Sequence, residues 1–260
     1  MGLDARSRPR AGRALLVCLA FVATACASSP ERVRDIARSW DKALVALPGR
    51  SLSVGPGSVS ATAPMPSVVH LHGCSGIIGD EVAWARHLGR AGYAVIMPDS
   101  FARAGRKRDC DPSRARGGLF PRVWEMREEE IGHALAQVRT LPWVDARNVF
   151  LMGHSEGGAA VALWGGGGVN AQVILGWWCR YDGTPALDGI RMPRSMPVLA
   201  VTFQVDGWFS PYYRESACGR VLRGHRAGEE IVLSGGGHEV SGSPRGIEAV
   251  VAFLRRHTVP

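Results

Sequence analysis

Residues 148–158 read Asn-Val-Phe-Leu-Met-Gly-His-Ser-Glu-Gly-Gly, an apolar run that ends in a Gly-X-Ser-X-Gly motif. The run from Val149 to Met152 favours a strand buried on both faces, and the residues from Ala159 to Trp164 favour a helix. A serine between them lies on a sharp turn, where flanking glycines avoid steric collisions. Because the chain holds 33 glycines, the motif alone is weak evidence. Its position between a strand and a helix is what favours Ser155 as a nucleophile.

Strand and helix patterns alternate along the chain from residue 67 to its end. The expected strands cover residues 67–71, 93–97, 149–152, 171–178, 197–205 and 230–233, and the expected helices cover residues 81–90, 122–141, 159–164 and 246–256. Strands joined through a helix imply parallel pairs with right-handed crossovers. The sequence therefore predicts one α/β domain, with a mainly parallel sheet between helices on both faces and ligands at the carboxyl ends of the strands.

The first 25 residues predict an export signal of the lipoprotein type. Four arginines precede an apolar run over residues 14–25, which is shorter than the ~20 residues that a membrane-spanning helix needs. Residues 22–26 resemble a lipobox, in which Cys26 becomes the lipidated first residue, although Ala23 stands where leucine is usual. Ordinary signal cleavage within residues 25–27 is the alternative. Either route predicts a protein of the bacterial cell envelope, with membrane contact only through a lipid anchor.

Residues 26–66 are expected to form an N-terminal helix and a linker ahead of the main domain, residues 67–260. Apolar residues recur at a helical period over residues 31–47. Residues 48–66 are rich in glycine, serine and proline, which leaves a linker and a weak hairpin as alternatives.

The net charge of +8 comes almost wholly from arginine. No nucleic-acid-binding motif accompanies it, so we expect no nucleic-acid partner. The arginines are most concentrated over residues 103–116, within a connection, residues 101–121, that is long for a compact domain. Because loops of that size tend to border functional sites, we expect substrate contacts there.

Four of the six cysteines lie beyond the signal, and an even number in an exported protein favours disulfides. Four cysteines allow three pairings. We expect Cys74 to pair with Cys110 and Cys179 with Cys218, because each pair follows neighbouring strands at the same edge of the sheet. None shows the spacing of a zinc site, and we expect neither a metal nor another cofactor.

A serine nucleophile needs a general base and an acid that orients the base. Asp206 directly follows the strand over residues 197–205, and His238 follows the strand over residues 230–233 through three glycines. Both lie after Ser155 in the required chain order. The rivals are Asp182 and Asp188 for the acid, and His225 and His257 for the base.

Acyl transfer also needs two backbone donors for the oxyanion of the tetrahedral intermediate. The amide after the nucleophile belongs to Glu156, and the loop after the first core strand offers the amide of Cys74. Gly73 and Gly76 allow that loop to curl towards Ser155.

With these features, residues 67–256 resemble the α/β-hydrolase superfamily and, within it, the dienelactone hydrolase family. The run Gly92-Tyr93 through Pro98-Asp99-Ser-Phe-Ala-Arg103 is similar to that family's second core strand and the loop after it. The resemblance implies that Arg103 binds a substrate carboxylate. Two departures are that the family's nucleophile is usually cysteine, where this chain has Ser155, and that its second carboxylate-binding arginine falls on Gly242.

Aromatic residues follow two of the expected strands, where they could fill the core or line a pocket. We take Trp178 and Trp208 as substrate-binding candidates from a group that holds Trp177, Trp178, Trp208, Phe209, Tyr212 and Tyr213.

The function that we expect is an exported serine carboxylesterase, which cleaves a small ester or lactone through an acyl-enzyme. One alternative keeps the same three residues but acts on peptides, as in relatives of prolyl oligopeptidase. Another is a noncatalytic envelope lipoprotein built on a hydrolase scaffold. The sequence does not indicate an oligomeric state.

Overall fold

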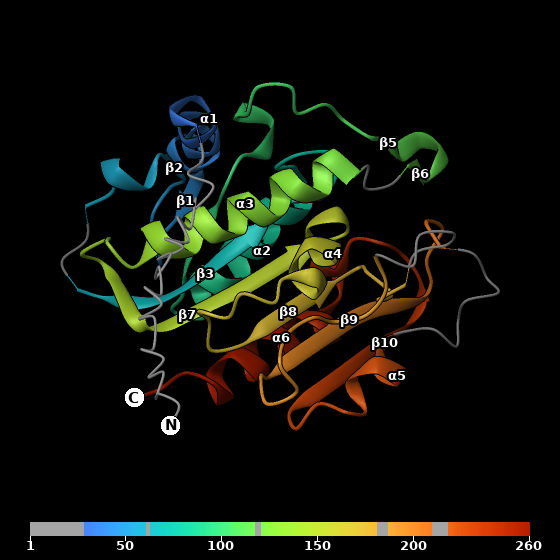
Figure 1. The fold of residues 1–260 in the computed structure, drawn as a ribbon. Coiled ribbons are helices and arrows are strands. Elements are labelled where there is room, and N and C mark those ends of the chain that lie inside the picture. The colour runs from blue at the N-terminus through green and yellow to red at the C-terminus, as the bar shows by residue number, and fades with distance from the viewer. Residues whose placement is uncertain (1–28, 61–62, 118–120, 181–186, 210–217) are drawn as a thin grey trace, which may run out of the picture.

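A mainly parallel sheet runs through the computed structural model, which describes residues 29–60, 63–117, 121–180, 187–209 and 218–260 (Figure 1). Its strand order is β10-β9-β8-β7-β3-β4-β1-β2, and all neighbours from β10 to β4 are parallel, whereas β1 runs antiparallel to β4 and to β2. The strands are β1 (Leu44–Ala46), β2 (Ser53–Val54), β3 (Met65–Leu71), β4 (Ala94–Met97), β7 (Val144–His154), β8 (Gln172–Leu175), β9 (Val198–Val205) and β10 (Gly228–Gly236). A separate small ribbon pairs β5 (Cys110–Asp111) with β6 (Arg116–Gly117).

Helices cover both faces of the sheet, as Figure 1 shows. One face carries α1 (Pro30–Asp41), α3 (Pro121–Val138) and α4 (Glu156–Leu163), and the other carries α2 (Gly79–Arg90) and α6 (Pro244–Arg256). The short helix α5 (Gly219–Leu222) packs beside β10. Each face buries its own apolar cluster, with Ile131 in the first and Trp84 in the second. The α/β-hydrolase architecture expected from the sequence is confirmed.

Local sequence explains where the outer helices begin. Ser29 accepts a hydrogen bond from the amide of Arg32 at the start of α1, and Ser243 accepts one from the amide of Gly246 at the start of α6. In both helices the next residue is a proline, which has no N–H to leave unsatisfied in the first turn.

The N-terminal segment differs from the expected helix and linker. The helix ends at Asp41, and residues 44–54 form β1 and β2, which extend the main sheet beyond β4. A short apolar run fits helix and strand periods alike, and here it pairs with the otherwise open edge of β4. Val45 is fully buried there. The expected boundary at residue 67 is therefore not a break in the sheet, since β1 and β2 belong to it.

Two disulfides join Cys74 to Cys110 and Cys179 to Cys218, which confirms the expected pairing. The first bond ties the β5–β6 ribbon to the loop after β3, and the second ties the segment after β8 to the start of α5. Cys26 and the rest of the expected export signal lie outside the described residues. In the part of the chain that is described, no helix is both long and apolar enough to cross a bilayer.

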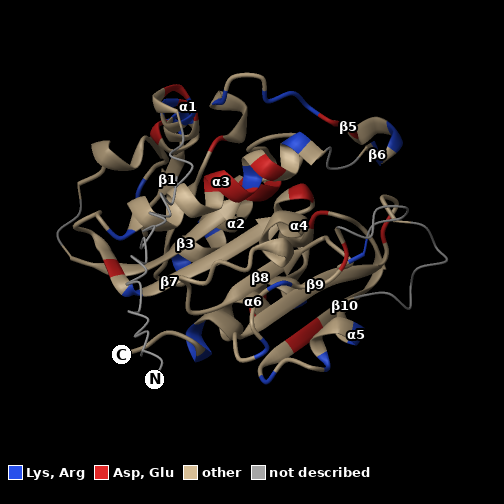
Figure 2. Cartoon of the chain, in the orientation of Figure 1, with Lys and Arg blue, Asp and Glu red and all other residues tan. Residues whose placement is uncertain are grey.

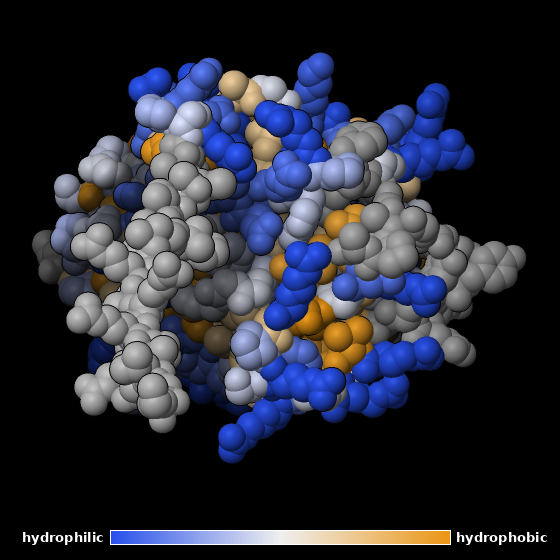
Figure 3. Space-filling view, in the orientation of Figure 1, coloured by the Kyte–Doolittle hydropathy of each residue, from blue (hydrophilic) through white to orange (hydrophobic). Residues whose placement is uncertain are grey.

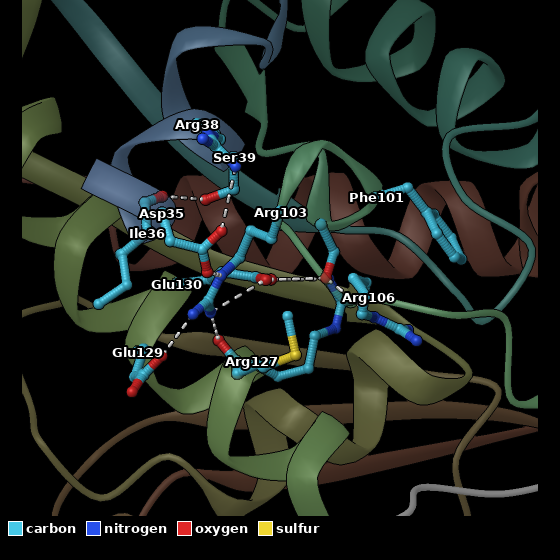
Figure 4. Close-up of polar contacts among 12 residues, drawn as sticks. Asp35, Ile36, Arg38, Ser39, Phe101, Arg103, Arg106, Arg127, Glu129 and Glu130 are labelled. Carbon is cyan, nitrogen blue, oxygen red and sulfur yellow. Dashed lines mark hydrogen bonds and ion pairs between the residues drawn. The ribbon is translucent and has the colours of Figure 1, made fainter. Parts of the chain in front are cut away.

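A buried arginine joins α1 to α3. The side chain of Arg103 is 3% exposed, and its guanidinium lies 3.1 Å from the carboxylate of Asp35 in α1 and 2.6 Å from that of Glu129 in α3 (Figure 4). It also lies 3.5 Å from the carboxylate of Glu130 and donates a hydrogen bond to the carbonyl oxygen of Met126. Acidic and basic residues occur together along both helices (Figure 2). Arg103 therefore fastens the N-terminal helix to the body of the protein.

We expect Arg103→Ala to lower the free energy of unfolding by about 1–3 kcal/mol, because it removes the buried guanidinium that binds Glu130 and the half-buried Asp35 and Glu129. The matched control is Arg114→Ala, which removes an arginine with a 74% exposed side chain that pairs with Asp111, and should change stability by less than about 0.5 kcal/mol. Urea unfolding measures both. Equal and small losses would contradict a structural role for Arg103.

Candidate functional site

Ser155 occupies a strained turn between β7 and α4. Its φ of 54° and ψ of −117° lie where residues other than glycine are uncommon. The turn also requires its glycines: a Cβ on Gly157 would lie 2.2 Å from the carbonyl oxygen of Leu71, and a Cβ on Gly153 would lie 2.2 Å from that of Gly157. We call residues 153–157 the serine turn. Its geometry is the sharp strand-to-helix turn expected from the motif.

The structure brings Ser155, His238 and Asp206 into one chain of hydrogen bonds. The Oγ of Ser155 lies 2.8 Å from Nε2 of His238, and Nδ1 of His238 lies 2.7 Å from Oδ2 of Asp206. Asp206 directly follows β9, and His238 lies in the loop of residues 237–242 after β10, which we call the histidine loop. Such an arrangement can move a proton from the hydroxyl to the imidazole while the carboxylate holds the ring.

Neighbouring groups fix the orientation of this chain. The second carboxylate oxygen of Asp206, Oδ1, accepts a hydrogen bond from the amide of Trp208 at 3.0 Å. The ring of Trp208 in turn stacks on that of His238, with centroids 5.3 Å apart. Asp206 is 3% exposed and His238 is 8% exposed, so water has little access to the pair.

The loop of residues 72–76 after β3, here called the oxyanion loop, borders Ser155 and is held from several sides. The amide of Gly73 donates to Glu81 at 3.1 Å, and the guanidinium of Arg127 donates to the carbonyl oxygen of His72. The disulfide to Cys110 anchors Cys74. The loop is thus fixed beside the serine turn, as the oxyanion-hole assignment for the Cys74 amide requires.

The side chain of Glu156, which directly follows Ser155, is held by two buried arginines. Its Oε1 lies 2.6 Å from the guanidinium of Arg106 and 3.2 Å from that of Arg127. These contacts turn the carboxylate towards α3. The backbone N–H of Glu156 belongs to the first turn of α4, where it has no carbonyl partner within the helix.

Arg127 also affects His72 in the oxyanion loop. Burial, together with the charge of Arg127, holds the pKa of His72 well below its usual value.

A pocket opens at Ser155 between the two disulfide-linked regions. Its walls come from the oxyanion loop, the β5–β6 ribbon and the segments after β8 and β9, and its lining residues are Cys74, Asp109, Cys110, Gly117, Ser155, Glu156, Trp177, Trp208, Phe209 and His238. The long basic loop therefore does border the site, as expected. Apolar surface gathers over the region of β8 and β9 and is edged by hydrophilic side chains (Figure 3).

Two expected substrate-binding residues lie elsewhere. Arg103 forms ion pairs with acids of α1 and α3, because the chain turns towards those helices directly after β4. It borders a different cavity, of about 500 Å³. Trp178 is 3% exposed and stacks on Phe209, with centroids 5.1 Å apart, so it supports the wall from behind. Trp177 lines the pocket in its place, and Trp208 lines it as expected.

The three rival residues that the structure describes are not part of the chain of hydrogen bonds. Asp188 is exposed, His225 precedes β10 and His257 follows the last turn of α6. Asp182, Tyr212 and Tyr213 lie outside the described residues.

Sequence reasoning missed the buried charges around the site: Asp80, Glu81, Arg106, Arg127 and His154. Asp80 and Glu81 read as a normal acidic helix start, and Arg127 reads as an i,i+3 partner of Glu130 in a surface helix. The one sequence feature that could have indicated this buried cluster was the histidine immediately before Ser155.

Asp80, Glu81 and His154 bring atoms that could bind a metal within 4.8 Å of one another. Backbone amides donate to both oxygens of Glu81 and to one of Asp80, and Nδ1 of His154 lies 3.6 Å from Glu81 and 3.7 Å from Asp80, so we assign no metal to them.

A protein-family model matches the sequence, and solved structures match the fold. The model of the dienelactone hydrolase family matches residues 54–187, which end before Asp206 and His238. No curated protein sequence matches the chain.

Among solved structures, a candidate dienelactone hydrolase from Klebsiella pneumoniae is 17% identical, with a TM-score of 0.55 over 76% of this chain and 89% of that one. Est1E from Butyrivibrio proteoclasticus is 15% identical, with a TM-score of 0.51 over 82% and 91%. The esterase domain of a Rhodothermus marinus protein is 18% identical, with a TM-score of 0.51 over 82% and 91%. At these identities the likeness is one of fold.

We expect Gly157→Ala to destabilise the protein by about 3 kcal/mol and to remove activity, since the added methyl group would collide with the carbonyl oxygen of Leu71. Gly242→Ala serves as the control, because nothing lies within 4 Å of its Cβ position. Thermal unfolding and ester hydrolysis report the two effects. A stable, active Gly157→Ala protein would contradict the close packing described above.

Proposed function

We propose that this chain, which belongs to the dienelactone hydrolase family, is a serine hydrolase that cleaves small carboxylic esters or lactones. The observation that carries the proposal is the continuous chain of hydrogen bonds from Ser155 through His238 to Asp206. The family's usual cysteine nucleophile is replaced by a serine, which needs such a base because its hydroxyl is a weak nucleophile by itself.

In the proposed reaction, Oγ of Ser155 attacks the carbonyl carbon of the ester while Nε2 of His238 takes the hydroxyl proton. The carboxylate of Asp206 stabilises the imidazolium that forms. The amides of Cys74 and Glu156 donate to the oxyanion. When the intermediate collapses, the alcohol leaves with the proton from His238 and an acyl-enzyme remains. Water, deprotonated by the same imidazole, then releases the acid and restores the serine.

The pocket walls favour an uncharged, apolar acyl or alcohol group. Trp177, Trp208 and Phe209 supply aromatic surface, and no arginine or lysine occurs among the described residues that line the pocket. A substrate carboxylate would lack the cation that the family resemblance assigned to Arg103. We therefore propose neutral esters rather than acidic lactones as substrates.

We further propose that the protein works outside the cytoplasm, as a lipoprotein that matures at Cys26. The two disulfides support this location, because disulfides persist in oxidising compartments. Helix α1 begins at Pro30, so a lipid on Cys26 would be tethered only a few residues from the folded domain.

We expect Ser155→Ala and His238→Ala each to lower kcat for a short acyl ester by roughly 10⁴-fold or more, with Asp206→Asn costing as much or somewhat less. The double variant of Ser155 and His238 should resemble either single variant, since the residues act as a unit. Labelling by a fluorophosphonate probe should disappear in Ser155→Ala. His225→Ala should keep wild-type turnover and labelling. Turnover by Ser155→Ala at the wild-type rate would refute the proposal, and an unlabelled wild-type protein would favour a noncatalytic role.

Lipidation predicts a definite mass for the mature protein. The chain recovered from membranes should begin at Cys26 and carry acyl groups, and Cys26→Ser should prevent their attachment. Mass spectrometry of the purified protein measures both. A chain that begins at Met1 and is found in the cytosol would exclude export.

A further inference from the structure

A buried histidine directly precedes the proposed nucleophile. His154 is 3% exposed. Its Nε2 lies 3.1 Å from the carbonyl oxygen of His238, and its Nδ1 lies 3.6 Å from a carboxylate oxygen of Glu81 and 3.7 Å from one of Asp80. One ring edge therefore faces the histidine loop, and the other faces two acids at the start of α2.

Those two acids hold other parts of the site. Glu81 accepts hydrogen bonds from the amide of Gly73 at 3.1 Å and from that of Ile78 at 3.0 Å, so it holds the start of the oxyanion loop and the segment just after it. Asp80 accepts from the amide of Ser241 in the histidine loop at 3.1 Å. Together with His154 they connect three segments that are far apart in the sequence.

The electrostatics favour the doubly protonated ring. Burial by itself lowers the pKa of His154, but its contact with Glu81 and the charges of Asp80 and Glu81 outweigh burial and raise this pKa to about 9. Burial raises the pKa of Glu81, whereas its contact with His154 and the Gly73 amide lower it to about 2. Two further imidazoles face this cluster. Burial lowers the pKa of His70 on β3 to about 4, so it is neutral, and the ring of His238 lies with its centroid 4.9 Å away.

We propose that His154, with both ring nitrogens protonated, is a positioning residue that locks the oxyanion loop, the serine turn and the histidine loop in their relative places. The inference rests on the proposed hydrolase function. One N–H is donated to the carbonyl oxygen of His238, and the other points at the paired carboxylates. The catalytic imidazole and the oxyanion donors are thereby held from the same buried point, behind Ser155.

Loss of the second proton should disturb this arrangement. A neutral ring keeps one N–H, so a lone pair faces either the carbonyl oxygen of His238 or the carboxylates of Asp80 and Glu81. Because the folded-state pKa of His154 is raised, its stabilising contribution is complete below the ordinary pKa of 6.5 and is lost as pH rises through about 9. We therefore expect kcat to fall over the same alkaline range.

The test is the pH profile of kcat for 4-nitrophenyl acetate, corrected for spontaneous hydrolysis, in wild-type protein and His154→Gln. Glutamine can still donate one hydrogen bond but does not titrate. We expect kcat to drop about 10- to 100-fold below pH 8, with KM little changed and the alkaline decline absent. His133→Gln, a half-buried histidine of α3 away from the site, should keep the wild-type profile.

A second variant covers the case in which His154→Gln does not fold. Glu81→Gln keeps the shape but removes one of the two anions, and should move the alkaline decline to lower pH by about one to three units. A wild-type enzyme whose alkaline decline is unchanged in Glu81→Gln, or in a folded His154→Gln, would overturn this inference alone. A wild-type protein that neither hydrolyses the ester nor reacts with a fluorophosphonate would overturn the proposed function and this inference with it.

Discussion

The contact between the start of α4 and the end of β3 is the constraint on which the site depends. Gly157 packs so closely against the carbonyl oxygen of Leu71 that a Cβ would lie 2.2 Å from it. The backbone at Ser155 must then double back, with its φ of 54°, to leave β7 and enter α4. Because the oxyanion loop begins at the next residue after Leu71, the same contact sets Ser155 beside the proposed oxyanion donors. Strain at one residue is maintained by packing on both sides.

Buried charges then fix what this contact has brought together. Arg127 binds the carbonyl oxygen of His72 and approaches Glu156 from α3, whereas Glu81 binds the amide of Gly73 from α2 on the other face of the sheet. A buried ion pair contributes little net stability, because desolvation offsets most of the attraction. Several such pairs around one loop are thus better explained by the geometry they maintain. Breaking any one of them leaves an uncompensated charge, which makes alternative loop positions costly.

The sequence was sufficient for those features that depend on local pattern and chain order. A buried strand before Gly-X-Ser-X-Gly predicted the serine turn, and the positions of Asp206 and His238 after successive strands predicted that they would meet Ser155. The disulfide pairing followed from the same topology, and the expected fold and family were confirmed. The catalytic roles of these residues stay a prediction.

Contacts between charged residues that are distant in the chain could not be predicted from the sequence. Arg103 reaches Asp35, 68 residues away, and Arg106 reaches Glu156, 50 residues away. Each arginine alone is compatible with a solvated surface, and only tertiary packing decides which acid it meets. The prediction that the helix continues over residues 44–47 was wrong for a related reason. The apolar spacing there fits a helix as well as a strand, and only the tertiary fold shows that the open edge of β4 is available for pairing.

Different parts of the long basic loop, residues 101–121, serve different purposes: one part attaches α1, and another forms a wall of the pocket. Near its start, Arg103 is bound to α1 and α3 through acids that lie outside the pocket. Three residues later, Arg106 lies with its guanidinium 4.7 Å from the ring of Phe101 (Figure 4). The same guanidinium lies 2.6 Å from the carboxylate of Glu156. Beyond it, Asp109 and Cys110 form pocket wall, and the disulfide joins that wall to the oxyanion loop. The arginine that attaches α1 is thus separated in sequence from the residues that form the pocket wall. Substitutions after Cys110 can alter the shape of the pocket without disturbing the attachment of α1.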